Sequence, residues 1–330
     1  MIAVLLFLLS AATIYFACKF FVNGIEWTGH KFGVGETATG SVLAAFGTAL
    51  PESAVTFMSV VFGVSAQQKD IGVGAALGGP LVVATLSYAM VGLVLWLCAR
   101  KLHRADHVIQ TDQRSLGKDQ LWFLGVFAFK IALGLVAFTG KSWLGLLFFA
   151  AYGVYAWRQI TGVLDVADPK TLEALKLRTR DANPHVGWVL LQTLGALGMI
   201  AVASYVFVGQ VEAIGHMLGM SAQLVALLLS PMATELPETM NAIIWVRQGK
   251  ERLALANISG AMMIQATVPS GLGILFTPWL LSAPLLIAGA VTSIAIVMLY
   301  LIFSHGRMSA PWLMLVGGWY AVFAAALALA

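Results

Sequence analysis

The stretch that decides the fold occurs twice, once in each half of the chain. The first copy, Phe46-Gly-Thr-Ala-Leu-Pro-Glu52-Ser, matches the second, Met232-Ala-Thr-Glu-Leu-Pro-Glu238-Thr, at a constant offset of 186 residues. A second match follows further on, where residues 74–80 correspond to residues 256–262. Each first segment carries a Pro-Glu pair inside apolar sequence, and matched segments of this kind indicate an internal repeat.

The composition around these segments is that of a membrane protein. Of the 330 residues, 60% are hydrophobic and 10% are charged, and the mean hydropathy is +0.88. Soluble domains have about 45 to 50% apolar and about 25% charged residues. Cys18 and Cys98 lie in apolar runs, which favours reduced, buried thiols over disulfides. With 19 Lys and Arg against 15 Asp and Glu, the positive charge is too diffuse to suggest nucleic acid as a partner.

Spans of about 20 mostly apolar residues are long enough to cross a bilayer as helices. The sequence predicts an all-α polytopic protein with about ten such spans, near residues 2–22, 34–64, 71–98, 120–138, 142–160, 186–208, 215–246, 253–276, 279–303 and 309–329. When these spans are threaded with both termini outside, nearly all Lys and Arg fall in loops on the cytoplasmic side, as expected for a bacterial inner membrane. The first span has no cationic start, so we expect a retained helix rather than a cleaved signal peptide.

This threading places five spans before the central loop and five after it, so the two halves have opposite orientations. We predict a first inverted repeat at 1–160 with its motif at 46–80, a central cytoplasmic loop at 161–185, and a second repeat at 186–330 with its motif at 232–262. Inverted repeats are typical of secondary transporters, whose binding sites lie near the midplane between the repeats. The central loop is too short to form a folded regulatory domain.

The chemistry of the repeated Pro-Glu pair points to a cation. Pro51 and Pro237 remove one backbone hydrogen bond each and are expected to break their helices. Freed carbonyls at membrane depth are tolerated only where they face protein, water or a ligand. Glu52 and Glu238 follow directly, and a carboxylate there needs a partner. Carboxylate, hydroxyl and carbonyl oxygens are the donors that Na⁺ and Ca²⁺ prefer, so each copy is interpreted as half of a cation site.

The two copies resemble the alpha repeats of the calcium:cation antiporter superfamily, the sodium/calcium exchanger type. Its pattern is Gly-Thr-Ser-Leu-Pro-Glu, followed one helix later by Gly-Asn-x-x-Gly-Ser-Asn. The resemblance implies ten helices in two inverted halves, ligands from helices two, three, seven and eight, and alternating access in which helices one and six slide past the others. It further implies Glu52 and Glu238 as the acidic ligands, including for a metal ion, with Thr48 and Thr234 as hydroxyl or carbonyl ligands.

The sequence departs from that pattern in the third and eighth spans. The Asn, Ser and Asn positions of the third span are Ala75, Gly79 and Pro80, which leaves almost no side-chain ligand there. The eighth span keeps Asn257 but has apolar residues at the other two positions. In the seventh span Glu235 replaces the small Ser of the family core and lies three residues before Glu238. The expected site is therefore asymmetric and rich in acids.

Three further polar residues lie within spans. Lys130, near the middle of the fourth span, either pairs with a site glutamate and stands in for a cation when the site is empty, or snorkels to the interface. Gln265 and Asn241 are either additional oxygen donors or helix–helix hydrogen-bonding residues. Glu26, His30, Lys31 and Glu36 are interpreted as a charge cluster at the membrane interface.

Three acids suit one divalent ion or two monovalent ions, and they can also bind protons. The resemblance to the sodium/calcium exchanger type implies an antiporter exchanging Na⁺ against Ca²⁺, with inorganic cations and the bilayer as partners and no cofactor. The alternatives are a proton-coupled cation antiporter and a non-transporting cation sensor or scaffold. A membrane enzyme is not predicted, because the chain has no His-Glu-x-x-His or Gly-x-Ser-x-Gly motif.

Overall fold

The computed structural model describes residues 2–62, 66–99, 108–109, 111–162, 172–219, 225–306 and 308–329. This part of the chain is helical and holds no strand, only one isolated bridge between Val108 and Ser309. The expected all-α fold is therefore confirmed. Within the described ranges, six helical stretches are long and apolar enough to cross a membrane: Ala3–Lys31, Gly72–Cys98, Val186–Phe207, Glu251–Phe276, Ala283–Ser304 and Ala310–Leu329. The count of ten spans stays a prediction.

The first half of the chain runs from α1 to α7. Its elements are α1 (Ile2–Lys31), α2 (Glu36–Ala38), the π-helical η1 (Thr39–Ala44), α3 (Ala45–Val61), α4 (Ala66–Val82), the π-helical η2 (Val83–Ser87), α5 (Tyr88–Cys98), α6 (Gln113–Leu135), the 3₁₀ turn η3 (Lys141–Leu144) and α7 (Gly145–Thr161). Part of the predicted central loop, residues 163–171, lies outside the described residues.

The second half follows a similar order. Its elements are α8 (Val186–Met217), the π-helical η5 (Val225–Leu229), α10 (Ser230–Thr234), α11 (Leu236–Arg247), α12 (Glu251–Phe276), α13 (Ala283–Ser304), α14 (Ala310–Val316) and α15 (Gly318–Leu329). The π-helical turns η1 and η5 begin 186 residues apart, which is the offset of the repeated motif. Each copy of the motif is thus preceded by the same unusual turn, a feature often found at functional sites.

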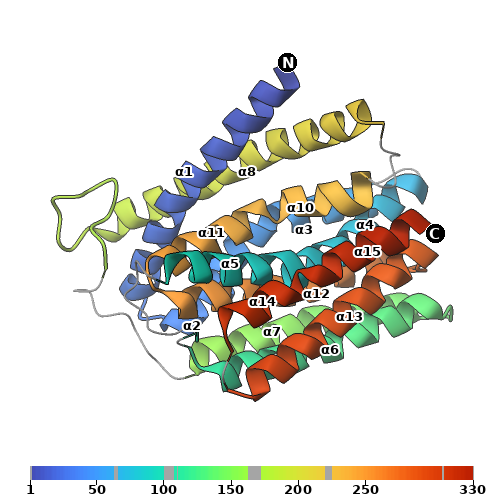
Figure 1. The fold of residues 1–330 in the computed structure, drawn as a ribbon. Coiled ribbons are helices and arrows are strands. Elements are labelled where there is room, and N and C mark those ends of the chain that lie inside the picture. The colour runs from blue at the N-terminus through green and yellow to red at the C-terminus, as the bar shows by residue number, and fades with distance from the viewer. Residues whose placement is uncertain are drawn as a thin grey trace.

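Helices α1 and α8 lie side by side on one side of the remaining helices (Figure 1). Their contact extends along both helices. Near one end the rings of Phe7 and Phe207 stack at 4.9 Å between centroids, and further on the hydroxyls of Thr28 and Thr193 lie 3.2 Å apart. The two helices are therefore packed against each other over most of their length.

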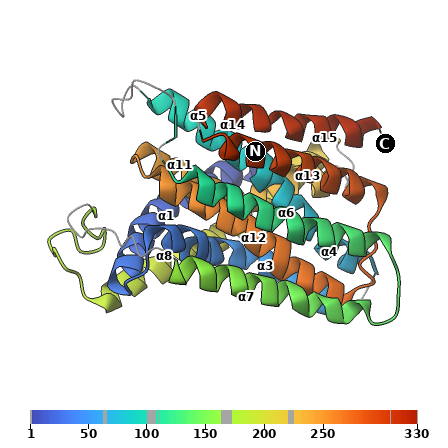
Figure 2. The ribbon, with the colours of Figure 1, turned by 90° about the horizontal axis from the view of Figure 1, so that it is seen from below.

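Helix α12 lies in the interior of the rest of the molecule, between α6 and α7 (Figure 2). Glycines let helices from opposite halves approach closely. A Cβ atom on Gly260 of α12 would lie 2.0 Å from the backbone oxygen of Ser41 in η1. A Cβ atom on Gly78 of α4 would lie 2.7 Å from Cγ of Pro231 in α10. The motif region of each half is therefore packed against a helix of the other half.

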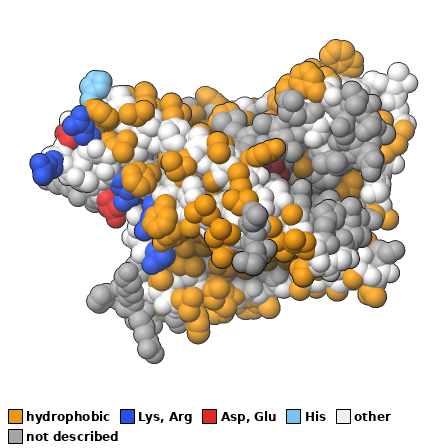
Figure 3. All heavy atoms as spheres, turned by 90° about the horizontal axis from the view of Figure 1, so that it is seen from above, with side chains coloured by type: hydrophobic (Ala, Val, Ile, Leu, Met, Phe, Trp, Pro, Cys, Tyr) orange, Lys and Arg blue, Asp and Glu red, His pale blue; other side chains and the backbone are white. Residues whose placement is uncertain are grey.

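The surface divides into a charged end and an apolar flank. Charged side chains gather at one end of the face drawn in Figure 3, and hydrophobic side chains are spread over much of the described surface beyond that end. Large apolar side chains project outward along α1 and α8, among them Leu5, Leu9, Leu194 and Val202. Such a surface suits contact with lipid, so the membrane assignment agrees with the fold.

Candidate cation site

The two copies of the motif have different backbones. Helix α3 continues through Pro51, so the predicted helix break is wrong in the first copy. The hydrogen bond lost is the one that the Gly47 backbone oxygen would accept from residue 51, and α3 keeps its helical course without it. In the second copy the helix is interrupted at Glu235, as predicted, and Pro237 lies in the first turn of α11, where proline needs no N–H. The second copy has a further proline, Pro231, where the first has Ala45.

These backbones bring three carboxyl groups into the interior. Glu52 comes from α3, Glu238 from α11, and Glu235 from the junction between α10 and α11. Their exposed fractions are 6%, 1% and 1% in the order Glu52, Glu238 and Glu235. The carboxyl groups of Glu52 and Glu235 interact with each other, and Glu238 interacts electrostatically with Glu235. Two buried carboxyl groups in contact need a proton or a cation between them, because two bare negative charges would repel.

Helix α4 forms one wall of this cluster. A Cβ atom on Gly79 would lie 2.3 Å from Oε1 of Glu52 and 3.0 Å from Oε1 of Glu235. Any side chain at this position would collide with a carboxylate. The missing family Ser on α4 is therefore explained by space, because the Glu52 and Glu235 carboxylates lie where a side chain would be.

Helix α12 contributes two amides to this cluster. Nε2 of Gln265 donates to Oε2 of Glu235 at 2.6 Å, and Nδ2 of Asn257 donates to the backbone oxygen of Glu238 at 3.4 Å. In both amides the side-chain oxygen is buried and has no hydrogen-bond partner in the described part of the chain. Gln265 and Asn257 are thus brought to the acids that the sequence singled out.

Several carboxylate oxygens are also without partners. Within the described residues, Oε2 of Glu52, Oε1 of Glu235 and Oε2 of Glu238 are buried and accept no hydrogen bond, and neither side-chain atom of Asn241 has a partner. Leaving such groups buried and unpaired is costly. A hard cation bound by these oxygens would remove that cost.

The two threonines are placed differently from each other. The hydroxyl of Thr48 donates to the backbone oxygen of Ala44 at 3.1 Å, and its side chain also interacts with Glu238. Thr234 is half-buried and donates to the backbone oxygen of Pro231 at 3.0 Å. Of the two predicted hydroxyl ligands, the structure brings Thr48 to a site carboxylate and gives Thr234 a contact within its own short helix.

No three His, Cys, Asp or Glu side chains converge into a metal-binding group in the described ranges. Glu52 and Glu238, the predicted metal ligands, therefore need other oxygens to complete a coordination shell. Calcium accepts carbonyl, amide and hydroxyl oxygens beside carboxylates. The unpartnered amide oxygens of Gln265 and Asn257 fit that requirement.

Lys130 is fully enclosed, with 0% of its surface exposed, so the snorkelling interpretation is wrong. Its ammonium group donates to the backbone oxygen of Ala76 and to the hydroxyl of Ser270, and it interacts electrostatically with Glu52. Sequence reasoning missed Ser270 because a serine in an apolar helix carries no signal of its own. The interpretation in which Lys130 pairs with a site glutamate agrees with this position.

Helix α1 covers the site. The thiol of Cys18 donates to the backbone oxygen of Pro237 at 3.8 Å. A Cβ atom on Gly47 of α3 would lie 3.2 Å from the ring of Phe21. One stretch of α1 therefore touches both copies of the motif.

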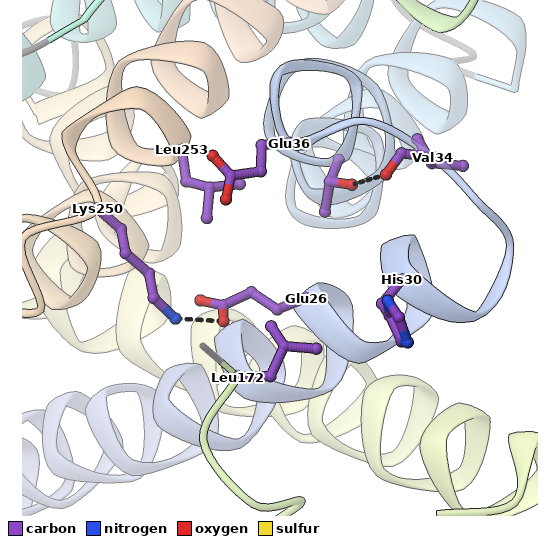
Figure 4. Close-up of a pocket in the computed structure, with 8 residues that line it drawn as sticks. Glu26, His30, Val34, Glu36, Leu172, Lys250 and Leu253 are labelled. Carbon is purple, nitrogen blue, oxygen red and sulfur yellow. Dashed lines mark hydrogen bonds and ion pairs between the residues drawn. The ribbon is translucent and has the colours of Figure 1, made fainter. Parts of the chain in front are cut away.

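A separate small pocket lies near the charged end of the molecule (Figure 4). Glu26 of α1 points toward Lys250 and forms an ion pair with it, and Nε1 of Trp245 donates to the same carboxylate at 2.8 Å. His30, Glu36 and Thr39 complete the polar lining. These groups are a charge cluster between α1 and the start of α12, distinct from the interior glutamates.

Comparison with known proteins bears directly on this arrangement. The model of the sodium/calcium exchanger protein family matches residues 2–161 and 188–329. The inner membrane protein YrbG of Escherichia coli (strain K12) is 26% identical over 259 residues, which cover 75% of this chain and 71% of that protein. The uncharacterized membrane protein MJ0091 of Methanocaldococcus jannaschii is 24% identical over 273 residues, covering 82% and 80%.

Solved structures of the sodium-calcium exchanger NCX_Mj have a similar fold. One soaked with 10 mM Na⁺ and zero Ca²⁺ aligns with a TM-score of 0.75 at 20% identity and covers 98% of both chains. Another, soaked with 2.5 mM Na⁺ and 0.1 mM Ca²⁺, gives 0.75 at 21% identity and covers 99% of both. The matched ranges of the family model include both copies of the Pro-Glu motif. This chain therefore belongs to the sodium/calcium exchanger protein family.

Proposed function

We propose that this protein is a secondary active antiporter that exchanges Na⁺ against Ca²⁺ by alternating access. One observation carries the proposal: the buried carboxylates of Glu52 and Glu235, from opposite halves of the chain, lie in contact, and Glu238 interacts with them electrostatically. Each of the three has a carboxylate oxygen that lacks a hydrogen-bond partner in the described residues. Membership of a family of cation transporters supports the same conclusion, and it argues against an enzyme.

The proposed ligands are the three glutamates, with Thr48 and the amide oxygens of Asn257 and Gln265. Thr234 and Asn241 are weaker candidates. Thr234 already bonds within α10, and Asn241, although buried and without a partner in the described part of the chain, has no contact with a site glutamate of the kind that Asn257 and Gln265 make. This asymmetric set combines more acids with fewer amides than the family pattern.

Together with the exchange function we propose the predicted topology, which has ten spans in two inverted repeats, in the inner membrane of a bacterium, with both termini outside. The matched π-helical turns before the two motifs support the repeat. In this arrangement α1 and α8 slide past the site together. The contact of α1 with both motif segments, through Phe21 and Cys18, couples that movement to the ligands.

Proton-coupled cation exchange is the second candidate, because Glu52 and Glu235 interact directly and a proton satisfies such a pair. A sensor or scaffold that does not transport is the third.

The test is uptake of radioactive calcium into proteoliposomes loaded with Na⁺, repeated with a pH gradient in place of the Na⁺ gradient. Uptake driven by outward Na⁺ is expected. Uptake driven only by protons would establish the second candidate, and calcium-dependent stabilisation without flux would establish the third.

A further inference from the structure

The ammonium group of Lys130 is held in the interior by the kinds of contact that bind a free cation. Its Nζ atom lies 2.8 Å from the backbone oxygen of Ala76 on α4 and 3.1 Å from Oγ of Ser270 on α12. The ring of Phe127 lies below it, with 4.4 Å between Nζ and the ring centroid. Nε1 of Trp279 donates to the backbone oxygen of Lys130 at 2.9 Å. Helices α4, α6 and α12 therefore fix the position of the ammonium group.

Two prolines explain why helix backbone oxygens are available near the ammonium group of Lys130. In a regular helix the backbone N–H of residue 80 would donate to the oxygen of Ala76, but Pro80 has no N–H, so that oxygen is free to accept from Lys130. On α12, Pro269 likewise leaves the oxygen of Gln265 without its usual donor. The hydroxyl of Ser270 donates to that oxygen at 3.4 Å and accepts from Lys130. The ammonium group thus uses helix oxygens of the kind that bind cations at membrane depth.

The ammonium group lies next to the acidic cluster. Ala76 and Gly79 are three residues apart on α4, which is a rise of about 4.5 Å along one face of the helix. Ala76 binds Lys130, and the space over Gly79 is filled by the carboxylates of Glu52 and Glu235. Lys130 and Glu52 also interact electrostatically. One turn of α4 therefore presents a positive charge and two carboxylates to the same interior space.

The charges of this cluster can be counted. Glu52, Glu235 and Glu238 supply three negative charges, and Lys130 supplies one positive charge. We propose that Lys130 is a permanently bound cation of the transport site, which leaves two negative charges for the exchanged ions. This inference rests on the proposed function and adds its stoichiometry: one divalent ion exchanges against two monovalent ions, and the exchange moves no net charge.

The proposed stoichiometry follows from the free-energy cost of placing a net charge inside a bilayer. A site carrying uncompensated charge through the membrane interior is penalised, so the states that cross are those in which ions balance the ligands. With Lys130 in place, balance is reached by one Ca²⁺ or by two Na⁺. Without that charge, three Na⁺ would balance the glutamates and one Ca²⁺ would leave one negative charge uncompensated. The exchange of three Na⁺ against one Ca²⁺ would then be slower and would move one net charge per cycle.

The test compares the wild type with Lys130→Met and Lys130→Arg in proteoliposomes. The Na⁺ gradient that just balances a fixed Ca²⁺ gradient is measured with the membrane potential clamped by valinomycin and K⁺. For the wild type and Lys130→Arg, the balancing Ca²⁺ ratio is expected to follow the square of the Na⁺ ratio and to be independent of voltage. For Lys130→Met it is expected to follow the cube and to shift tenfold for about 59 mV.

The outcomes distinguish a failure of the role proposed for Lys130 from a failure of the proposed Na⁺/Ca²⁺ exchange. Sodium-driven calcium flux whose balance point moves with voltage in the wild type would overturn the role of Lys130 and leave the proposed exchange intact. The absence of sodium-driven flux in the wild type would overturn the proposed exchange itself. If Lys130→Met does not fold, the wild-type balance point still decides, because it differs between the two stoichiometries.

Discussion

The two copies of the Pro-Glu motif are similar in sequence and differ in structure. In the first, α3 runs unbroken to Glu52, and its partner helix α4 offers Gly79 where the family has a ligand. In the second, the chain is broken at Glu235, and its partner helix α12 offers Asn257 and Gln265. Gly79, which lacks the family's side chain, lies next to the carboxylate of Glu235, which the family pattern lacks. The carboxylate of Glu235 therefore occupies the space in which a side chain at position 79 would lie, and both changes affect the same site.

The strongest test of this comparison is to remove one acid from each half. Glu52→Gln and Glu238→Gln are each expected to lower sodium-driven calcium uptake by at least about 100-fold, because a charged ligand contributes about 3 kcal/mol or more. Uptake per folded protein is the measurement. Glu173→Gln is the matched control, because that side chain is 53% exposed. Wild-type rates in either site variant would show that the site does not use both halves equally.

A second test concerns the wall that α4 provides. Gly79→Ala places a methyl group 2.3 Å from Oε1 of Glu52 and is expected to displace that carboxylate, with about a tenfold loss of calcium affinity. Gly74→Ala on the same helix is the control, because a Cβ atom there has no neighbour within 4 Å in the described structure. Equal affinities for the two variants would show that Glu52 moves away without consequence.

A third test asks whether Glu235 is a ligand or a structural residue. Glu235→Ser restores the family residue and removes one negative charge and the hydrogen bond from Gln265. We expect flux to persist with calcium preference over sodium lowered by a few-fold to about tenfold, since one charge-assisted contact is lost. Glu235→Gln keeps the size of the side chain and should shift preference in the same direction. An unchanged preference in both variants would place the function of Glu235 elsewhere.

Much of the site was predictable from the sequence because its signal is duplicated. Glu52 and Glu238 stand at matching positions in matching segments, and a carboxylate that recurs inside apolar sequence indicates a shared ligand role. Lys130 was singled out by its place inside an apolar span. Its partners were not predictable, because the Ala76 backbone oxygen is freed by Pro80, four residues later on a helix distant in the sequence.

The same limit applies to the backbone of the motifs. Proline predicts a helix break from local chemistry alone, and this succeeded at Glu235 and failed at Pro51. The two copies differ at Pro231, where the first has Ala45, and in the helices packed against them, with Gly260 of α12 against Ser41 and Gly78 of α4 against Pro231. Tertiary contacts of this kind have no periodic signature in the chain.

The smallest expected effect distinguishes the unbroken copy from the broken one. In Pro51→Ala the new N–H can donate to the backbone oxygen of Gly47 within the continuous helix α3, so the free energy of unfolding should rise by about 1 kcal/mol. In Pro237→Ala the new N–H lies in the first turn of α11, where no intrahelical acceptor is available, and the change should be smaller. Thermal unfolding of both variants in detergent measures the difference. Equal changes would mean that the two copies share one backbone in solution, and the asymmetry of the site would then have to come from Glu235 alone.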